Sequence, residues 1–156
     1  MDKQQLIDKA IQLAVENVRS GSGGPFGAIV VRRGQIVASG ANQVTSTLDP
    51  TAHAEIVAIR AACRAIGSFE LSDCEIYCSC EPCPMCLAAI YWARAARVYF
   101  GAKAEAAVQA GFADGFFKEQ ICLSYEKQQL PIEQLGHKDV LAPFQAWNAK
   151  TDKTLY

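Results

Sequence analysis

The segment SCEPCPMC, residues 79–86, constrains this chain more than any other stretch. Cys83 and Cys86 are three residues apart and follow Pro82, whose fixed φ suits the first turn of a helix. Two thiols at this spacing lie on one helical face, and a helix N-terminus lowers their pKa toward the thiolate form that binds metal. The segment therefore predicts a helix that begins here and presents two zinc ligands.

His53, in the stretch TAHAE at residues 51–55, can supply a third ligand. Asp49 is a suitable N-cap for a second helix and Pro50 a suitable first residue, which places His53 near that helix start. Three protein ligands leave a fourth position for water, which is the pattern of a catalytic zinc site. Glu55 could move protons there. Because residues two apart on a helix diverge by roughly 200°, His53 and Glu55 share a site only if it lies over the helix end.

Each half of this pattern has an ordinary explanation when taken alone. A C-x-x-C pair also occurs in redox proteins and in structural zinc hooks, and a lone histidine is more often a core or surface residue. The two halves together, each at a predicted helix start, favour the zinc site. Cys80 precedes Glu81 and Pro82 and so falls outside the helical turn, and we do not expect it to be a fourth ligand. No role is predicted for the remaining thiols, Cys63, Cys74, Cys78 and Cys122.

The composition fits one globular domain over residues 1–156. The chain is 51% hydrophobic and 20% charged, and its seven cysteines, an odd number, do not suggest a disulfide framework. No apolar run is long enough to span a bilayer, and the first residues lack the layout of a signal peptide, so we expect a cytoplasmic protein without a membrane partner. A net charge of −1 argues against a nucleic-acid substrate held on a basic surface.

Hydrophobic periodicity predicts alternating helices and strands. An amphipathic helix opens the chain, with Asp2 and Gln5 as a capping box, and strands at 26–31 and 36–39 form a hairpin. Strands at 74–79 and 97–102 flank the cysteine helix, which implies a parallel crossover and hence an α/β fold with helices covering the sheet. The glycine cluster at 21–27 cannot stay helical, and with Phe26 it is a candidate pocket rim.

Along nearly its whole length, the sequence resembles the bacterial guanine deaminases of the cytidine deaminase fold. The stretches that carry the resemblance are GGPFGAIVV, TLDPTAHAE, SCEPCPMC followed by IYWAR, AGFADGFF and APFQAW. His53, Glu55 and the segment from Pro82 to Cys86 also satisfy the signature H-x-E…P-C-x-x-C of zinc-dependent base deaminases. The metal and glutamate motifs mark the superfamily, and the aromatic and C-terminal segments indicate its guanine branch.

The resemblance implies a three-layer α/β/α fold with a central mixed five-stranded sheet. It implies that His53, Cys83 and Cys86 hold one zinc ion per chain and that Glu55 and Asp114 transfer protons. The residues that it implies in contact with the purine are Phe26, Asn42, Ala54, Trp92 and Tyr156. From the residues alone, Asn42 and Asp114 would be interpreted as turn residues.

The reaction implied is the zinc-dependent hydrolysis of guanine to xanthine and ammonia, in purine catabolism. In similar enzymes the C-terminal segment, here residues 118–156, crosses to the partner subunit of a homodimer and closes its site, which would place Tyr156 over the neighbour's substrate. Leu141, Phe144 and Trp147 recur in this segment at helical spacing, which indicates an apolar face that needs a surface to cover.

Three alternatives stay open. A tRNA adenosine deaminase shares the zinc and glutamate motifs and flips its target base out of an RNA loop, but such a protein should carry a basic face. Another small-base deaminase, acting on cytosine for example, is the second alternative. The third is a catalytically idle zinc-binding interaction module, which would need neither Glu55 nor an open fourth zinc position.

Overall fold

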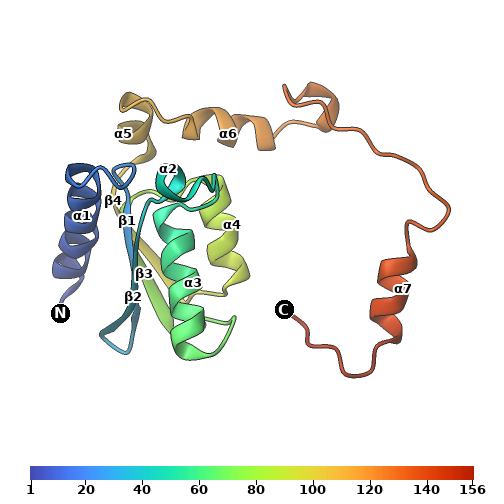
Figure 1. The fold of residues 1–156 in the computed structure, drawn as a ribbon, viewed down its shortest axis with the longest axis horizontal. Coiled ribbons are helices and arrows are strands. Elements are labelled where there is room, and N and C mark those ends of the chain that lie inside the picture. Colours follow the sequence, from blue (N-terminus) through green and yellow to red (C-terminus); the bar gives the residue numbers. More distant parts are fainter. The chain divides into compact units, whose positions relative to one another are not determined.

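The computed structural model describes all residues from 1 to 156, and they divide into two compact units, Met1–Lys118 and Glu119–Tyr156. The first unit contains the sheet and the helices that cover it (Figure 1). The second contains a 3-10 turn at Tyr125–Lys127 and helix α7 (Ala142–Ala149), and none of its residues is buried. No helix of the protein combines the length and apolar character needed to cross a membrane.

The sheet has four strands in the order β2-β1-β3-β4. Strand β1 (Gly27–Arg32) pairs antiparallel with β2 (Gln35–Ala41) and β3 (Cys74–Cys80), and β3 pairs parallel with β4 (Arg97–Ala102). The predicted hairpin and the predicted parallel crossover are both confirmed. Arg33 and Gly34, between β1 and β2, have φ values of 50° and 79°, and two consecutive positive φ angles suit the tight hairpin turn whose twist matches the strands.

The fifth strand implied by the resemblance is absent, so that prediction was wrong in strand number although the sheet is mixed. After β4 the chain continues as helices α5 (Ala104–Gln109) and α6 (Asp114–Ile121). The alanine-rich sequence AEAAVQ of α5 favours a helix, and the β-branched runs that favour a strand end with β4.

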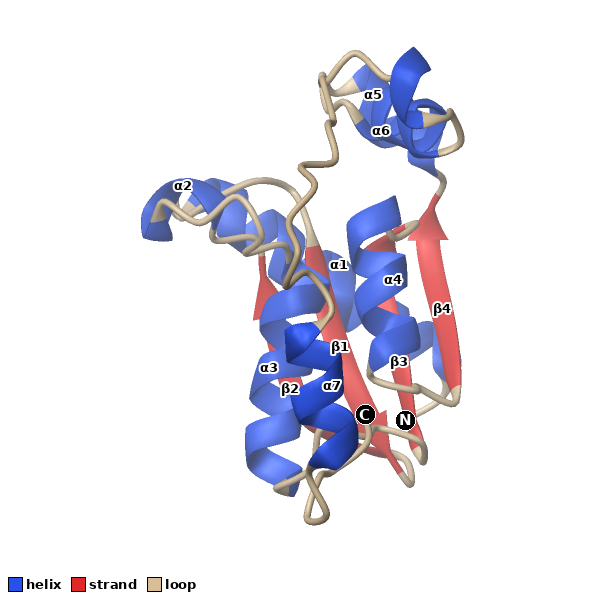
Figure 2. Ribbon diagram, turned by 90° about the vertical axis from the view of Figure 1, so that its right-hand side faces the viewer, coloured by secondary structure: helices blue, strands red, loops and turns tan.

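Helix α1 (Lys3–Arg19) lies on one face of the sheet, and α3 (Ala54–Ile66) and α4 (Pro84–Trp92) cover the other face, as Figures 1 and 2 show. The predicted capping box is confirmed, because Asp2 accepts from the Gln5 amide and the Gln5 side chain accepts from the Asp2 amide. Successive side chains of β1 point to opposite faces of the sheet and so contribute to two hydrophobic cores, one on each face. Val30 packs in the core that contains the α3 residues, whereas Ile29 packs with residues of α1.

Two helix starts differ from the sequence prediction. Helix α3 begins at Ala54 with His53 as its extended N-cap (φ −68°, ψ 158°), so Asp49 is not the N-cap. The Asp49 carboxylate instead accepts from the amide and the hydroxyl of Thr51 at 2.8 and 2.7 Å, a local turn that competes with helix initiation. Likewise Pro84, rather than Pro82, occupies the first turn of α4.

Gly40 of β2 permits the close approach of α3 to the sheet. A Cβ atom at this position would lie 2.4 Å from the Ala54 carbonyl oxygen and 2.6 Å from the Ala58 amide nitrogen. Both distances are shorter than real Cβ contacts, so only glycine fits here without movement of the helix. Because Ala54 follows His53 directly, this contact helps to fix the position of His53 above the sheet.

We therefore expect Gly40→Ala to lower the free energy of unfolding by about 1–3 kcal/mol, the usual range for overpacking. Urea denaturation followed by circular dichroism measures this change. Gly136→Ala is the matched control, because a Cβ atom there would meet nothing within 4 Å, and we expect its effect to stay within about 0.5 kcal/mol. Equal stability of the two variants would contradict the packing argument.

Candidate active site

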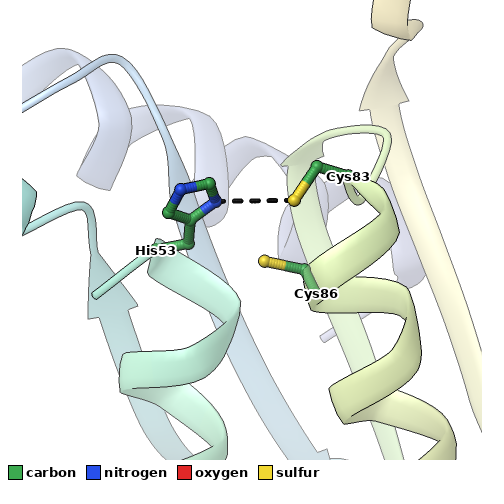
Figure 3. A group of neighbouring side chains, drawn as sticks. All are labelled: His53, Cys83 and Cys86. Atoms are coloured by element: carbon green, nitrogen blue, oxygen red, sulfur yellow. Dashed lines mark hydrogen bonds between the residues drawn. The ribbon is translucent and has the colours of Figure 1, made fainter. Parts of the chain in front are cut away.

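The N-termini of α3 and α4 bring the three predicted zinc ligands together. His53 is the N-cap of α3, Cys83 is the N-cap of α4, and Cys86 lies in the first turn of α4. Their ligand atoms all lie within 4.8 Å of one another, and Figure 3 shows the imidazole facing the two sulfur atoms. The Sγ atom of Cys83 is 3.6 Å from Nδ1 of His53.

This geometry fits a zinc ion. Typical zinc–sulfur and zinc–nitrogen bonds in a tetrahedral arrangement place the two ligand atoms about 3.6 Å apart, which matches the separation of Cys83 Sγ and His53 Nδ1. Two thiolates and one imidazole form a donor set that zinc readily accepts, and three ligands leave one position open. Cys80 does not belong to the group, as expected, because its sulfur contacts the Lys103 carbonyl oxygen at 3.7 Å.

The two thiols are electrostatically coupled. A hydrogen bond with Cys86, and a smaller contribution from the hydrogen bond with His53, lower the pKa of the Cys83 thiol to about 4 against the opposing effect of burial. The pKa of Cys86 is raised, first because of its hydrogen bond with Cys83 and then by burial. The hydrogen bond with Cys83 also raises the pKa of His53. The site therefore already stabilises one thiolate, the form that coordinates metal.

Glu55 lies in the first turn of α3 and is buried, with 7% of its surface exposed. His53 precedes the helix in an extended conformation, so the two side chains reach one cavity over the helix end, as the sequence argument required. Burial raises the pKa of Glu55 above the usual carboxyl value. A carboxyl group shifted in this direction can both accept and donate a proton nearer neutral pH, which general acid–base catalysis requires.

A cavity of about 460 Å³ opens over these helix ends, within the range of about 300–1,000 Å³ that is typical of small-molecule sites. Phe26 and Asn42 line it, as predicted, together with Asp114 at the start of α6. Burial raises the pKa of Asp114, and the nearby Cys83 thiolate raises it further. The cavity thus combines aromatic side chains, an amide and the carboxyl groups of Glu55, Glu81 and Asp114, which suits a flat polar heterocycle.

Phe112 and Glu81 are among the lining residues that the sequence analysis missed, together with Val44 and Thr45. Phe112 meets Phe26 edge-to-face, with ring centroids 4.8 Å apart and an interplanar angle of 79°. Glu81 accepts a hydrogen bond from the Ala104 amide at 3.2 Å, which links the cysteine segment to the start of α5. The only sequence signals for these two contacts were that Glu81 lies in the segment SCEPCPMC and Phe112 in the segment AGFADGFF. Neither residue type implies a cavity contact by itself.

Two other predicted contact residues of the first unit, Trp92 and Ala54, do not line this cavity with their side chains. Trp92 is the last residue of α4, about 9 Å along the axis from Cys86 at the helical rise, and is 67% exposed. Ala54 is fully buried in the core beside β1, so only its backbone could face a ligand. Tyr156 belongs to the second unit and is 70% exposed.

Comparison with protein families gives a match over residues 1–102 to the cytidine and deoxycytidylate deaminase zinc-binding region. Among curated proteins, the chain is 47% identical to a guanine deaminase of Bacillus subtilis over 156 residues, which covers 100% of both proteins. It is also 42% identical to a tRNA-specific adenosine deaminase of Agrobacterium fabrum over 100 residues, which cover 63% of this chain and 64% of the relative.

Solved structures of guanine deaminases also match this chain. The crystal structure of guanine deaminase from Bacillus subtilis superimposes with a TM-score of 0.98 and covers 100% of this chain and 99% of its own. A guanine deaminase from Nitrosomonas europaea, 30% identical, superimposes with a TM-score of 0.70 over 73% of this chain and 66% of its own. The resemblance stated from the sequence is therefore confirmed.

We expect Cys83→Ala to lose bound zinc, because only one imidazole and one thiolate remain and one of the two negatively charged ligands is gone. Metal analysis of protein purified without chelators measures the loss, and thermal unfolding in parallel shows the linked drop in stability. Cys122→Ala is the control, because this thiol is exposed and lies outside the ligand group. Wild-type zinc content in Cys83→Ala would exclude this residue as a ligand.

Proposed function

Because the chain belongs to the cytidine and deoxycytidylate deaminase family of zinc-binding proteins, we propose that it catalyses the hydrolytic deamination of guanine to xanthine and ammonia. The observation that carries the proposal is full-length similarity to the guanine deaminase of Bacillus subtilis, in sequence and in structure. The tRNA-specific adenosine deaminases match a smaller part, for example 63% of the chain, and the net charge of −1 does not favour RNA binding.

We assign His53, Cys83 and Cys86 as ligands of one zinc ion per chain, on the basis of their mutual distances. A zinc ion in such a site lowers the pKa of a coordinated water to about neutrality and so supplies a nucleophile at physiological pH. The sulfur and nitrogen ligands all come from helix starts, where the backbone is held by the helices themselves. His53 and Cys83 line the same cavity as Glu55, so a zinc ion held by these ligands would lie near this carboxyl group.

Glu55 is assigned as the proton carrier of the reaction. Its carboxylate accepts the proton of the attacking water and delivers it to the ring nitrogen beside the carbon that bears the amino group. The Glu55 carboxylate then takes the proton of the hydroxyl group added to the ring carbon and passes it to the amino group, which leaves as ammonia while the new carbonyl of xanthine forms. Asp114, whose pKa burial raises, lies on the cavity wall and is assigned as a second proton donor.

Base recognition is assigned mainly to cavity residues outside the two ligand helices. Asn42 offers a side-chain amide, and Phe26 offers an aromatic face that Phe112 braces edge-to-face. The backbone of Ala54, at the first position of α3, is the part of that residue that could contact the base. These assignments give the cavity a hydrogen-bonding amide and a stacking aromatic ring, which suit a planar purine.

The purified protein should release ammonia from guanine and far less from adenine, cytosine or a tRNA anticodon stem. Glu55→Gln should retain zinc but turn over more slowly, on the order of a hundred- to ten-thousandfold, because the amide keeps the shape without the transferable proton. Ammonia release and metal content are measured on the same samples. Preferred turnover of the tRNA stem would replace the proposal with its closest rival, and a near-native rate for Glu55→Gln would assign the proton transfer to another group.

We also propose a homodimer in which residues 118–156 of one subunit close the site of its partner. Support comes from the second unit itself, which has no buried residue while Leu141, Phe144 and Tyr156 are 60%, 66% and 70% exposed. Apolar side chains exposed to this degree need a surface to cover them. Capping of the partner's substrate by Tyr156 is then expected, and the stacking of Trp92 on the purine stays a prediction from the resemblance. The cytoplasmic location expected from the sequence stays a prediction.

Deletion of residues 152–156 should leave a folded, zinc-loaded protein with strongly reduced guanine deamination. Mixing this truncated chain with Glu55→Gln tests the exchange of segments, because the mixed dimer has one site with an intact Glu55 closed by an intact partner segment. Each mixed dimer should release ammonia at about half of the wild-type rate, so an equimolar mixture after full exchange, with about half of its dimers mixed, should reach about a quarter. Absence of recovery, with subunit exchange shown by mass spectrometry, would place the segment over the site of its own chain or outside catalysis.

A further inference from the structure

Asn17 is a buried polar residue of α1 for which the reaction described above has no use. Its surface is 7% exposed, although polar residues of this helix are mostly exposed. The side-chain Nδ2 atom donates to the carbonyl oxygen of Gly24 at 2.8 Å and to that of Asn42 at 2.9 Å. Gly24 lies in the loop after α1, and Asn42 follows β2, and both line the cavity. One side chain therefore ties together two segments of the cavity wall.

We call the hydrogen-bonded contact of Asn17, Gly24 and Asn42 the joint, and it also orients the side chain of Asn42. Its Oδ1 atom accepts hydrogen bonds from the backbone amides of Gly24 and Val44, each at 3.3 Å. Its backbone amide donates to the carbonyl oxygen of Phe26 at 3.1 Å. With Oδ1 held by two backbone donors, the NH₂ group is the part of the Asn42 amide left to serve a ligand. The position of Gly24, which Asn17 fixes, thus decides which way this amide points.

Gly23 shows how tightly this joint is packed. A Cβ atom at Gly23 would lie 2.1 Å from the carbonyl oxygen of Asn42 and 3.0 Å from Nδ2 of Asn17. The loop backbone therefore passes directly against the groups that Asn17 connects. A shift of either segment by a few tenths of an ångström would disturb the hydrogen bonds to both Gly24 and Asn42.

We propose that Asn17 is a positioning residue for base recognition, which aims the Asn42 NH₂ group at a hydrogen-bond acceptor of the purine, a carbonyl oxygen or a ring nitrogen. Asn17 does not touch the base and acts only through Asn42 and the loop at Gly23 and Gly24. This inference rests on the proposed function, because contact between Asn42 and the base belongs to that proposal.

A double-mutant cycle with guanine tests the coupling. Asn17→Ala should lower kcat/KM about tenfold, mainly through a higher KM, which is the size expected for one misplaced hydrogen bond. In the Asn42→Ala background the same substitution should change kcat/KM less than about twofold, because the group that Asn17 positions is already gone. Guanine affinity measured by calorimetry in the Glu55→Gln background gives the same cycle where turnover is too slow to follow.

Two further variants sharpen the test. Gly23→Ala disturbs the joint from the loop side and should show the same loss and the same dependence on Asn42. Gln12→Ala removes an exposed amide of the same helix, which donates to Glu16 at 2.8 Å, and should leave kcat/KM unchanged. If Asn17→Ala does not fold, Asn17→Ser, which keeps a single donor, takes its place in the cycle.

Zinc content and thermal stability are recorded for every variant. Equal losses from Asn17→Ala with and without Asn42 would show a purely structural role and overturn the inference while leaving the proposed function intact. A zinc-loaded wild-type protein that does not deaminate guanine would overturn the proposed function and the inference with it.

Discussion

The site depends on the meeting of two helix N-termini above one sheet. His53 and Cys83 are both N-cap residues, of α3 and α4, and their side chains face each other because the two helices pack on the same face of the sheet. A helix N-terminus stabilises negative charge through its unpaired amide groups, so it is a favourable place for a thiolate. The fold thus supplies both the geometry and part of the electrostatics before any metal is bound.

The packing that holds these helix ends is unusually close. Strand β2 contacts α3 at Gly40, where a side chain would collide with the helix backbone next to His53. Strand β3 leads directly into the cysteine segment, and the parallel pairing of β3 with β4 requires α4 to return along the sheet. The metal ligands are therefore placed by the ends of regular elements, and loop flexibility contributes little to their positions.

Other parts of the cavity lining come from loops that are held by hydrogen bonds between side chains and backbone. Asn17 links the segments at Gly24 and Asn42, and Glu81 links the cysteine segment to the start of α5. The segments at Gly24 and Asn42 thus belong to other elements than the candidate zinc ligands, whereas Glu81 lies two residues from Cys83.

The sequence by itself identified His53, Cys83 and Cys86 as one candidate ligand group, Glu55 beside it and the crossover around the cysteine helix, because residue spacing and strand–helix–strand order are local properties. It misplaced the start of α3, because Asp49 forms a local turn in place of a helix cap, and the implied fifth strand does not form. Only the tertiary structure decided that Phe112 and Glu81 reach the cavity, that Trp92 lies away from it, and that Asn17 holds Asn42. These relations join residues far apart in the chain. The residue types involved also occur commonly on protein surfaces and in cores, so they do not indicate a site by themselves.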